Sequence, residues 1–362
     1  MIKIPLSKYQ GVDQIHLLQL SETLKDYIQF YINCCGLLKY GGSITDLNNQ
    51  LKRKLHKPTF KSLLTPISTK PYKELSNLEF VFRSKCFRSD FLSQIDHIAD
   101  FLMDLLNSSS SLYFENLLVN KPNELINYYN DIVQKYSVIQ TDGSESVFQD
   151  NEILKGSVHA LLSRIFNYDD FERGQLVKQW NAYKLCEALG INVCPYCNRM
   201  YTFTVVNGSS NIIRPELDHY FPKSKFPLFS VSFFNLIPSC KICNSTLKQQ
   251  DYLKIDEYLH PYMNELFSTY MFDYLPLDTD AFEGKNKNFN IFINKHGFSD
   301  KKSDNFIDKF KIEQVYSLHK ELIPKFVNKH RYYPNSSLNE ISRLLKVSKE
   351  ELLQTLYHPP HE

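Results

Sequence analysis

Two Cys-x-x-Cys pairs constrain the fold of this chain more than any other feature. The first pair is Cys194-Pro-Tyr-Cys197 and the second is Cys240-Lys-Ile-Cys243. Paired knuckles of this spacing supply the four thiolates of a closed, tetrahedral structural zinc site. The alternative is that these cysteines are small buried hydrophobic residues without a metal. We interpret them as zinc ligands that stabilise a segment too rich in loops to bury a core of its own.

A second set of polar residues lies within this cysteine frame, by which we mean residues 194–244. Asp218 and His219 are adjacent, and Asn235 follows them before the second pair. Asn244 comes directly after the last cysteine. Carboxylate and amide oxygens suit a hard divalent cation, and an imidazole can act as a general base near neutral pH. The set therefore indicates phosphate chemistry.

The order of these motifs resembles the HNH endonucleases of ββα-metal fold, in their four-cysteine zinc subtype. The match covers 194–248 and is closest to HNH nucleases of bacterial anti-phage defence systems, such as the nuclease component of Septu. The resemblance implies an endonuclease that hydrolyses phosphodiester bonds of DNA with bound Mg²⁺ or Mn²⁺. It also implies that an ATPase of the same defence system is the protein partner.

The resemblance assigns a role to each of these polar residues. Asp218 and Asn244 are expected to bind the catalytic cation, and His219 is expected to deprotonate the attacking water. Asn235 is expected to fix the intervening loop and to orient the histidine. Many relatives have His where this chain has Asn244, and this difference favours Mg²⁺, a cation that prefers oxygen ligands.

Positive charge gathers at the cysteine frame. The whole chain has a formal charge of +2, whereas residues 194–254 alone carry +4. A phosphate backbone is attracted to such a region. The candidate nucleic-acid contacts are Lys223, Lys225, Lys241 and Lys248. For each lysine the alternative is an ordinary solvated side chain.

Two other functions are compatible with the motifs. The chain could be a catalytically silent zinc-ribbon protein that binds DNA or acts as an adapter. The intact set of Asp218, His219 and Asn244 argues against this, because a binding protein does not need all three. It could also be an HNH-type RNA nuclease, because the same chemistry does not distinguish between the two sugars.

Composition and length define the class of protein. Hydrophobic residues make up 43% and charged residues 23% of the 362 residues, which is usual for a globular chain of two or three compact units. The amino terminus has no apolar run of signal-peptide length, and no stretch is long enough to span a bilayer. We therefore expect a cytoplasmic protein with no membrane association, where thiols stay reduced and can bind zinc.

Hydrophobic periodicity predicts an α+β fold, with mostly helical flanks around a small ββα-metal core. We expect a helical regulatory or partner-binding domain at 1–170, a nuclease domain at 171–262 and a mainly helical region at 263–362. The expected helices lie at 91–106, 153–166, 176–189 and 306–327, with two more that begin at capping boxes, Ser337 with Glu340 and Ser348 with Glu351. The expected strands lie at 201–206, 211–217, 236–239 and 288–294, and a helix should follow Cys243.

Overall fold

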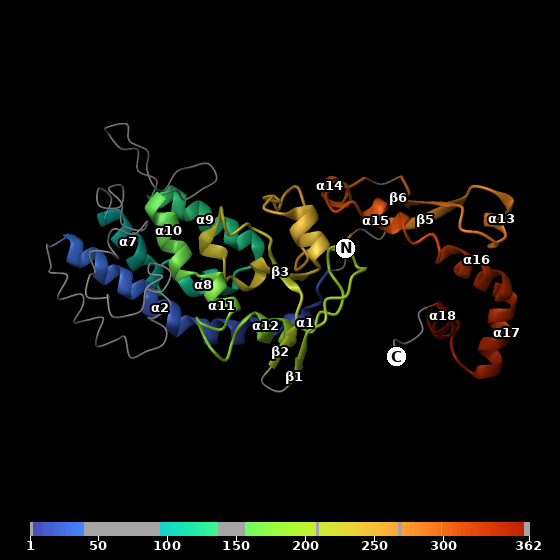
Figure 1. Ribbon diagram of the computed structural model, residues 1–362, viewed down its shortest axis with the longest axis horizontal. Coiled ribbons are helices and arrows are strands. Elements are labelled where there is room, and N and C mark those ends of the chain that lie inside the picture. The colour runs from blue at the N-terminus through green and yellow to red at the C-terminus, as the bar shows by residue number, and fades with distance from the viewer. Residues whose placement is uncertain are drawn as a thin grey trace. The chain divides into compact units, whose positions relative to one another are not determined.

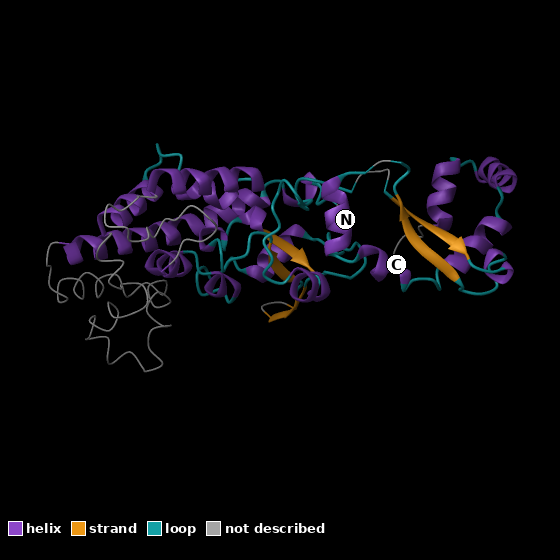
Figure 2. Ribbon diagram, turned by 90° about the horizontal axis from the view of Figure 1, so that it is seen from above, coloured by secondary structure: helices purple, strands orange, loops and turns teal. Residues whose placement is uncertain are grey.

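The computed structural model describes residues 3–39, 95–136, 156–207, 210–266, 270–297 and 299–357. The fold combines helices with short antiparallel hairpins, and it divides into two compact units, Met1–Glu265 and Leu266–Glu362 (Figures 1 and 2). The regions 1–170 and 171–262, which the sequence analysis treats as separate domains, both lie in the first unit. In the described part of the chain, no helix is long and apolar enough to cross a membrane.

The first unit contains most of the helices. Its helices are α1 (Leu6–Tyr9), α2 (Val12–Lys39), α7 (Ile95–Leu106), α8 (Phe114–Val119), α9 (Pro122–Tyr136), α10 (Gly156–Ile165), α11 (Tyr168–Glu172) and α12 (Ala182–Leu189). Its strands and short turns are β1 (Val205–Asn207), β2 (Ser210–Ile213), β3 (Glu216–His219), η3 (Pro227–Phe229), η4 (Phe233–Asn235), β4 (Leu236–Ser239) and η5 (Ile242–Lys248).

Helix α2 is part of the core of this unit. Leu20, Leu24, Tyr27 and Ile28 are all fully buried, at the spacing of one helical face. This face packs against α7 and α8, so the N-terminal segment belongs to the same hydrophobic core as the rest of the unit (Figure 1).

The helix expected at 176–189 begins later than its periodicity suggests. The side chain of Asn181 caps the first turn, because its Oδ1 accepts hydrogen bonds from two backbone N–H groups, at 3.0 and 3.2 Å. The helix ends at the expected stop, where Gly190 has a φ of 54° and donates its N–H to the carbonyl of Cys186. Of the helices expected at 91–106 and 153–166, residues 91–94 and 153–155 lie outside the described residues, and the remainder is helical as α7 and α10.

The strands of the cysteine frame form two hairpins instead of one. Pro215 has no backbone N–H to donate, and it separates β2 from β3 within the strand expected at 211–217. Strand β1 pairs with β2, and the turn residue Gly208 lies outside the described residues. Strand β3 pairs antiparallel with β4, with Asp218 opposite Ile237 and His219 opposite Leu236.

The second unit is built on one hairpin, formed by β5 (Met271–Pro276) and β6 (Phe289–Asn294), and the strand expected at 288–294 is confirmed. Its helices are α13 (Thr279–Phe282), α14 (Lys301–Lys309), α15 (Ile312–Ser317), α16 (Ile323–Tyr332), α17 (Asn335–Leu345) and α18 (Lys349–Tyr357). The single helix expected at 306–327 is wrong, because Lys311 takes a left-handed conformation with a φ of 48° and ends the first of three helices.

Only one of the two expected capping boxes forms. In α18 the backbone N–H of Glu351 donates to Oγ of Ser348 at 3.0 Å, and the Glu351 carboxylate accepts the N–H of Ser348 at 3.3 Å. Helix α17 begins at Asn335, before the expected Ser337, and no side chain caps it.

Candidate functional site

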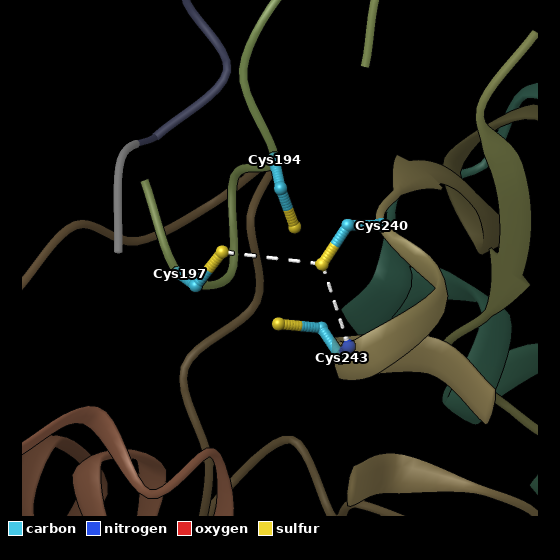
Figure 3. Close-up of side chains that lie close together, drawn as sticks. All are labelled: Cys194, Cys197, Cys240 and Cys243. Carbon is cyan, nitrogen blue, oxygen red and sulfur yellow. Dashed lines mark hydrogen bonds between the residues drawn. The ribbon is translucent and has the colours of Figure 1, made fainter. Parts of the chain in front are cut away.

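The four cysteines of the two pairs meet in one buried cluster (Figure 3). Their Sγ atoms all lie within 4.8 Å of one another, and Sγ of Cys197 lies 4.0 Å from Sγ of Cys240. Two thiolates on one tetrahedral zinc are about 3.8 Å apart, given Zn–S bonds of about 2.3 Å. The cluster can therefore hold a metal such as zinc with little movement.

Backbone hydrogen bonds shape the first knuckle. The N–H of Cys194 donates to the carbonyl of Met200 at 2.9 Å, and the N–H of Asn198 donates to the carbonyl of Cys194 at 2.7 Å. Asn198 has a φ of 50°, a left-handed conformation that Asn tolerates better than most residues. Hydrogen bonds between the thiols lower the pKa of Cys197 and of Cys240, the latter to about 7, and raise the pKa of Cys194 and of Cys243.

Asp218 is buried on strand β3 and both of its oxygens accept hydrogen bonds. Tyr196, which lies within the first knuckle, donates its hydroxyl to Oδ2 at 2.5 Å. Lys248 donates from Nζ to Oδ1 at 3.0 Å and to the carbonyl of His219 at 2.7 Å. Both side chains of this ion pair are almost wholly buried, at 1% and 2% exposure. The knuckle and the turn after the second pair thus converge on one carboxylate.

The position of Lys248 differs from the expected nucleic-acid contact. The residue is fully buried, and it lies at the end of the π-helical turn η5, where the N–H of Gln249 donates to the carbonyl of Asn244. This turn directs Lys248 toward Asp218 on strand β3. The lysine therefore compensates the buried carboxylate and is not exposed to a phosphate backbone.

His219 lines a cavity of about 310 Å³ together with Asp218 and Asn244. Its Nε2 lies 2.9 Å from the carbonyl of Ser230, and since a carbonyl only accepts, Nε2 carries the proton and Nδ1 is the basic atom. The ring of Tyr168 packs edge-on at 4.4 Å between centroids. Burial lowers the pKa of His219 to about 3, so the imidazole is neutral at physiological pH.

Asn235 lies in the core and ties together the loop after β3. Its Oδ1 accepts the N–H of Phe221 at 2.7 Å, and its Nδ2 donates to the carbonyls of Phe221 and Phe229 at 3.1 and 2.8 Å. Phe229 directly precedes Ser230, the residue that holds His219. The structure thus places Asn235 where it can fix the loop, and it has no direct contact with His219 among these hydrogen bonds.

Asn244 faces strand β3. Its Nδ2 donates to Oε2 of Glu216 at 2.9 Å, and the hydroxyl of Ser245 donates to the same oxygen at 2.7 Å. Glu216 and Asp218 alternate with Leu217 along the strand, so both acids face the turn η5. Glu216, Asp218 and Asn244 all line the cavity, and each has a side-chain oxygen.

The three other candidate lysines lie nearer the surface. Lys223 pairs with Asp169 at 2.8 Å, lies 4.9 Å from the centre of the Tyr168 ring, and lines the same cavity. Lys225 lies 6.0 Å from the ring of Tyr252. Lys241 is exposed beside Cys240.

The comparisons with known proteins give one partial similarity. The chain is 32% identical over 74 residues to protein Ea31 of Escherichia phage lambda. The match covers 20% of this chain and 21% of that protein. No protein-family model and no solved structure matches the chain.

Sequence reasoning missed two contributors to the site. Tyr196 occupies a variable position inside Cys-x-x-Cys, and nothing in that spacing indicates its bond to Asp218. Arg214, which lines the cavity, forms an ion pair with Glu172 of helix α11. Glu172 lies far from the motifs in sequence, so only the fold brings it to the site.

Proposed function

We propose that this chain is a metal-dependent HNH endonuclease that hydrolyses phosphodiester bonds of DNA. One observation carries the proposal most. His219 is held by the Ser230 carbonyl in the tautomer that leaves Nδ1 basic, and it lines a cavity with Asp218 and Asn244. These are the residues that the resemblance to HNH endonucleases assigns to catalysis.

The tautomer and the location of His219 suit a general base. Hydrolysis requires a water to lose a proton as it attacks phosphorus, and a neutral imidazole can accept that proton. Burial lowers the pKa of the side chain to about 3, which keeps His219 neutral but also makes it a weaker base. The support for this role is therefore the tautomer of the ring and its place in the wall of the cavity. Transfer to Nδ1 would create an imidazolium whose Nε2–H still donates to the Ser230 carbonyl, so the ring keeps its orientation during the reaction.

The oxygen atoms of the cavity suit a hard cation. Asp218 and Asn244 would hold Mg²⁺ or Mn²⁺, and Glu216 lies on the same wall of the cavity. When bound, the cation supplies charge neutralisation at the phosphate and at the leaving oxygen. The ammonium group of Lys248 also pairs with Asp218, at 3.0 Å. Lys223, Lys225 and Lys241 remain candidates for contact with the nucleic-acid backbone.

A second reading has one observation in its favour. Both oxygens of Asp218 already accept hydrogen bonds, from Tyr196 and Lys248. A carboxylate satisfied in this way could belong to a silent zinc-ribbon protein that binds DNA or serves as an adapter. The two functions differ in one respect that is simple to measure, which is whether the purified chain cleaves nucleic acid.

The test is a cleavage assay with purified protein on supercoiled plasmid DNA and on single-stranded and structured RNA. Each substrate is incubated with Mg²⁺, Mn²⁺ or EDTA, and with wild type or His219→Ala. We expect nicking of the plasmid that requires the cation and the histidine. Cleavage of RNA alone would instead support an RNA nuclease. Binding without cleavage of either substrate would favour the silent zinc-ribbon protein.

We also propose, from the resemblance alone, that the chain is the effector nuclease of a cytoplasmic anti-phage system with an ATPase partner. The charge of +4 over residues 194–254 attracts any phosphate backbone, so cleavage needs restraint from elsewhere. We expect weak cleavage by the chain alone and faster cleavage with an ATPase of the same defence system. Equal cleavage with and without that ATPase, across ATP concentrations, would contradict this part of the proposal.

A further inference from the structure

The backbone carbonyls of residues 229–231 are held by three different side chains. Asn235 Nδ2 donates to the first carbonyl at 2.8 Å, and His219 Nε2 donates to the second at 2.9 Å. Nε2 of His16, from helix α2, lies 2.8 Å from the third, which is the carbonyl of Val231. We call these three groups the carbonyl row. The catalytic histidine therefore binds its middle member, and a residue of the N-terminal helix binds the next.

The ring of His16 has a fixed tautomer and orientation. Trp180 donates its indole N–H to Nδ1 at 3.0 Å, so Nδ1 is the acceptor and Nε2–H donates to Val231. The side chain has no exposed surface, and the rings of Phe171 and Phe233 pack edge-on, each 5.6 Å away between centroids. Burial also keeps the imidazole neutral by lowering its pKa to about 4. Both polar atoms of the ring are thus committed to one arrangement.

The contact between His16 and the carbonyl row is part of a wider interface. The ring of Tyr9 packs edge-on against Phe234 at 5.5 Å and against Tyr262 at 5.4 Å. The backbone N–H of Ile4 donates to the carbonyl of Pro261 at 2.8 Å. The first residues of the chain are therefore packed against Phe234, which lies three residues after the row, and against the segment at 261–262.

We propose that His16 is a positioning residue that orients the His219 imidazole by holding the carbonyl row. The inference rests on the proposed function, in which His219 is the general base. Each carbonyl belongs to a planar peptide unit. With the units on both sides held by Asn235 and His16, the unit that carries the Ser230 carbonyl cannot rotate freely. The N-terminal helix thereby acts on the catalytic base without touching it.

Two substitutions separate positioning from packing. His16→Phe keeps an aromatic ring but removes both hydrogen bonds, whereas His16→Gln retains a donor for Val231 and an acceptor for Trp180. We expect His16→Phe to lower kcat on a duplex oligonucleotide by between about tenfold and a hundredfold with KM unchanged, because small misplacements of a catalytic group cost rate. We expect His16→Gln to restore most of the rate.

The chain offers a matched control for this pair. His159 also bonds a carbonyl of the same loop, since its Nε2 lies 2.8 Å from the carbonyl of Ser224, outside the carbonyl row. His159→Phe makes the same chemical change and should leave kcat unaltered. A loss of rate in His159→Phe equal to that in His16→Phe would show that any loosening of the loop suffices, and it would overturn the specific role of His16.

A readout that does not depend on cleavage keeps this inference distinct from the proposed function. The ¹⁵N imidazole resonances of His219, identified by their loss in His219→Ala, report its tautomer. We expect a single Nε2–H form in wild type and in His16→Gln, and a mixture of tautomers in His16→Phe. If wild type cleaves nothing, the proposed function fails, while the tautomer still reports whether His16 positions His219.

Trp180→Phe is the second variant in case His16→Phe does not fold. It leaves His16 in place but removes the donor that fixes its tautomer, so it should shift the tautomer of His219 and lower kcat in the same direction, by less. An unchanged His219 tautomer and an unchanged kcat in the folded variants would overturn the proposal.

Discussion

The chain carries the dipeptide Asp-His twice, at residues 96–97 in helix α7 and at residues 218–219 at the end of strand β3. In α7 both side chains are exposed, whereas Ile98, Phe101 and Leu102 of the same helix are fully buried. In β3 the aspartate is 2% exposed and the histidine is half-buried against Tyr168. The same two residue types thus meet two different environments.

The difference shows that the surroundings, and not the dipeptide, determine what these side chains can do. At 218–219 the cysteine frame supplies Tyr196 to one oxygen of the aspartate and Lys248 to the other. The loop after β3 supplies the carbonyl that fixes the tautomer of His219. Each of these neighbours can be removed experimentally, and the pair at 96–97 serves as the internal reference.

Loss of the metal should have the largest effect. We expect about one zinc per chain, and Cys197→Ser should lose it together with nuclease activity. Structural zinc contributes on the order of 10 kcal/mol to the folding of small zinc domains, so β3 and β4 should lose protection from amide exchange while α7 keeps it. Hydrogen exchange followed by mass spectrometry measures both regions at once. Equal protection of β3 with and without zinc would contradict the claim that the cysteine frame creates the environment of residues 218–219.

Removal of the buried ammonium group of Lys248 should have the next largest effect on stability. Lys248→Met leaves the Asp218 carboxylate buried without its counter-charge, which typically costs about 3–5 kcal/mol. Urea unfolding followed by circular dichroism gives the free energy of unfolding. Lys184→Met is the matched control, because Lys184 pairs with Glu187 on the surface. Loss of an exposed pair of this kind should cost less than about 1 kcal/mol. If Asp218 binds the catalytic cation, added Mg²⁺ should restore part of the loss in Lys248→Met.

The two aspartates should differ in their effect on rate. Asp218→Asn keeps the shape of the side chain but removes the charge that attracts a divalent cation, and we expect a loss of plasmid nicking on the order of a hundredfold. Asp96→Asn makes the same change on the surface of α7 and should leave the rate unchanged. Titration with Mn²⁺ should show weaker binding in the first variant only. Wild-type rates in a folded Asp218→Asn protein would exclude this residue as a ligand.

A smaller effect is expected in acid. The pKa of His16 falls from 6.5 in the unfolded chain to about 4 in the folded one, because burial disfavours the charged ring. The unfolded state therefore binds more protons between these values, and stability present above pH 6.5 is lost as the pH falls toward 4. Between pH 7 and pH 5, His16 should lower the free energy of unfolding by about 2 kcal/mol, since one pKa unit corresponds to about 1.4 kcal/mol. Asp13 is the charged neighbour that opposes this shift.

The control for the acid effect uses the exposed histidine of the other pair. Free energies of unfolding at pH 7 and pH 5 should differ less in His16→Gln than in wild type, whereas His97→Gln should reproduce wild type. An identical pH dependence in His16→Gln and wild type would show that folding does not lower the pKa of His16.

Local sequence patterns predicted those parts of the fold that depend on short-range chemistry. The cysteine spacing placed four thiols together, Gly190 ended its helix, and Ser348 with Glu351 formed the expected capping box. Strand 236–239 followed from the same local signals.

Features that depend on long-range packing could not be predicted. Lys248 was predicted as a nucleic-acid contact, because the sequence does not show that the π-helical turn after Cys243 directs it into the protein. The contact of His16 with Val231 joins residues that are 215 positions apart, and no motif links them. The break at Lys311 follows from a single left-handed residue inside an otherwise helical pattern.

The central claim is that His219 is a general base because of its surroundings, and comparison of the two histidines tests it most directly. The measurement is the first-order rate of plasmid nicking in Mg²⁺ by His219→Ala and by His97→Ala, with folding confirmed by circular dichroism. The account predicts a loss on the order of a hundredfold or more in His219→Ala and the wild-type rate in His97→Ala. A folded His219→Ala protein that nicks DNA as fast as His97→Ala would contradict it.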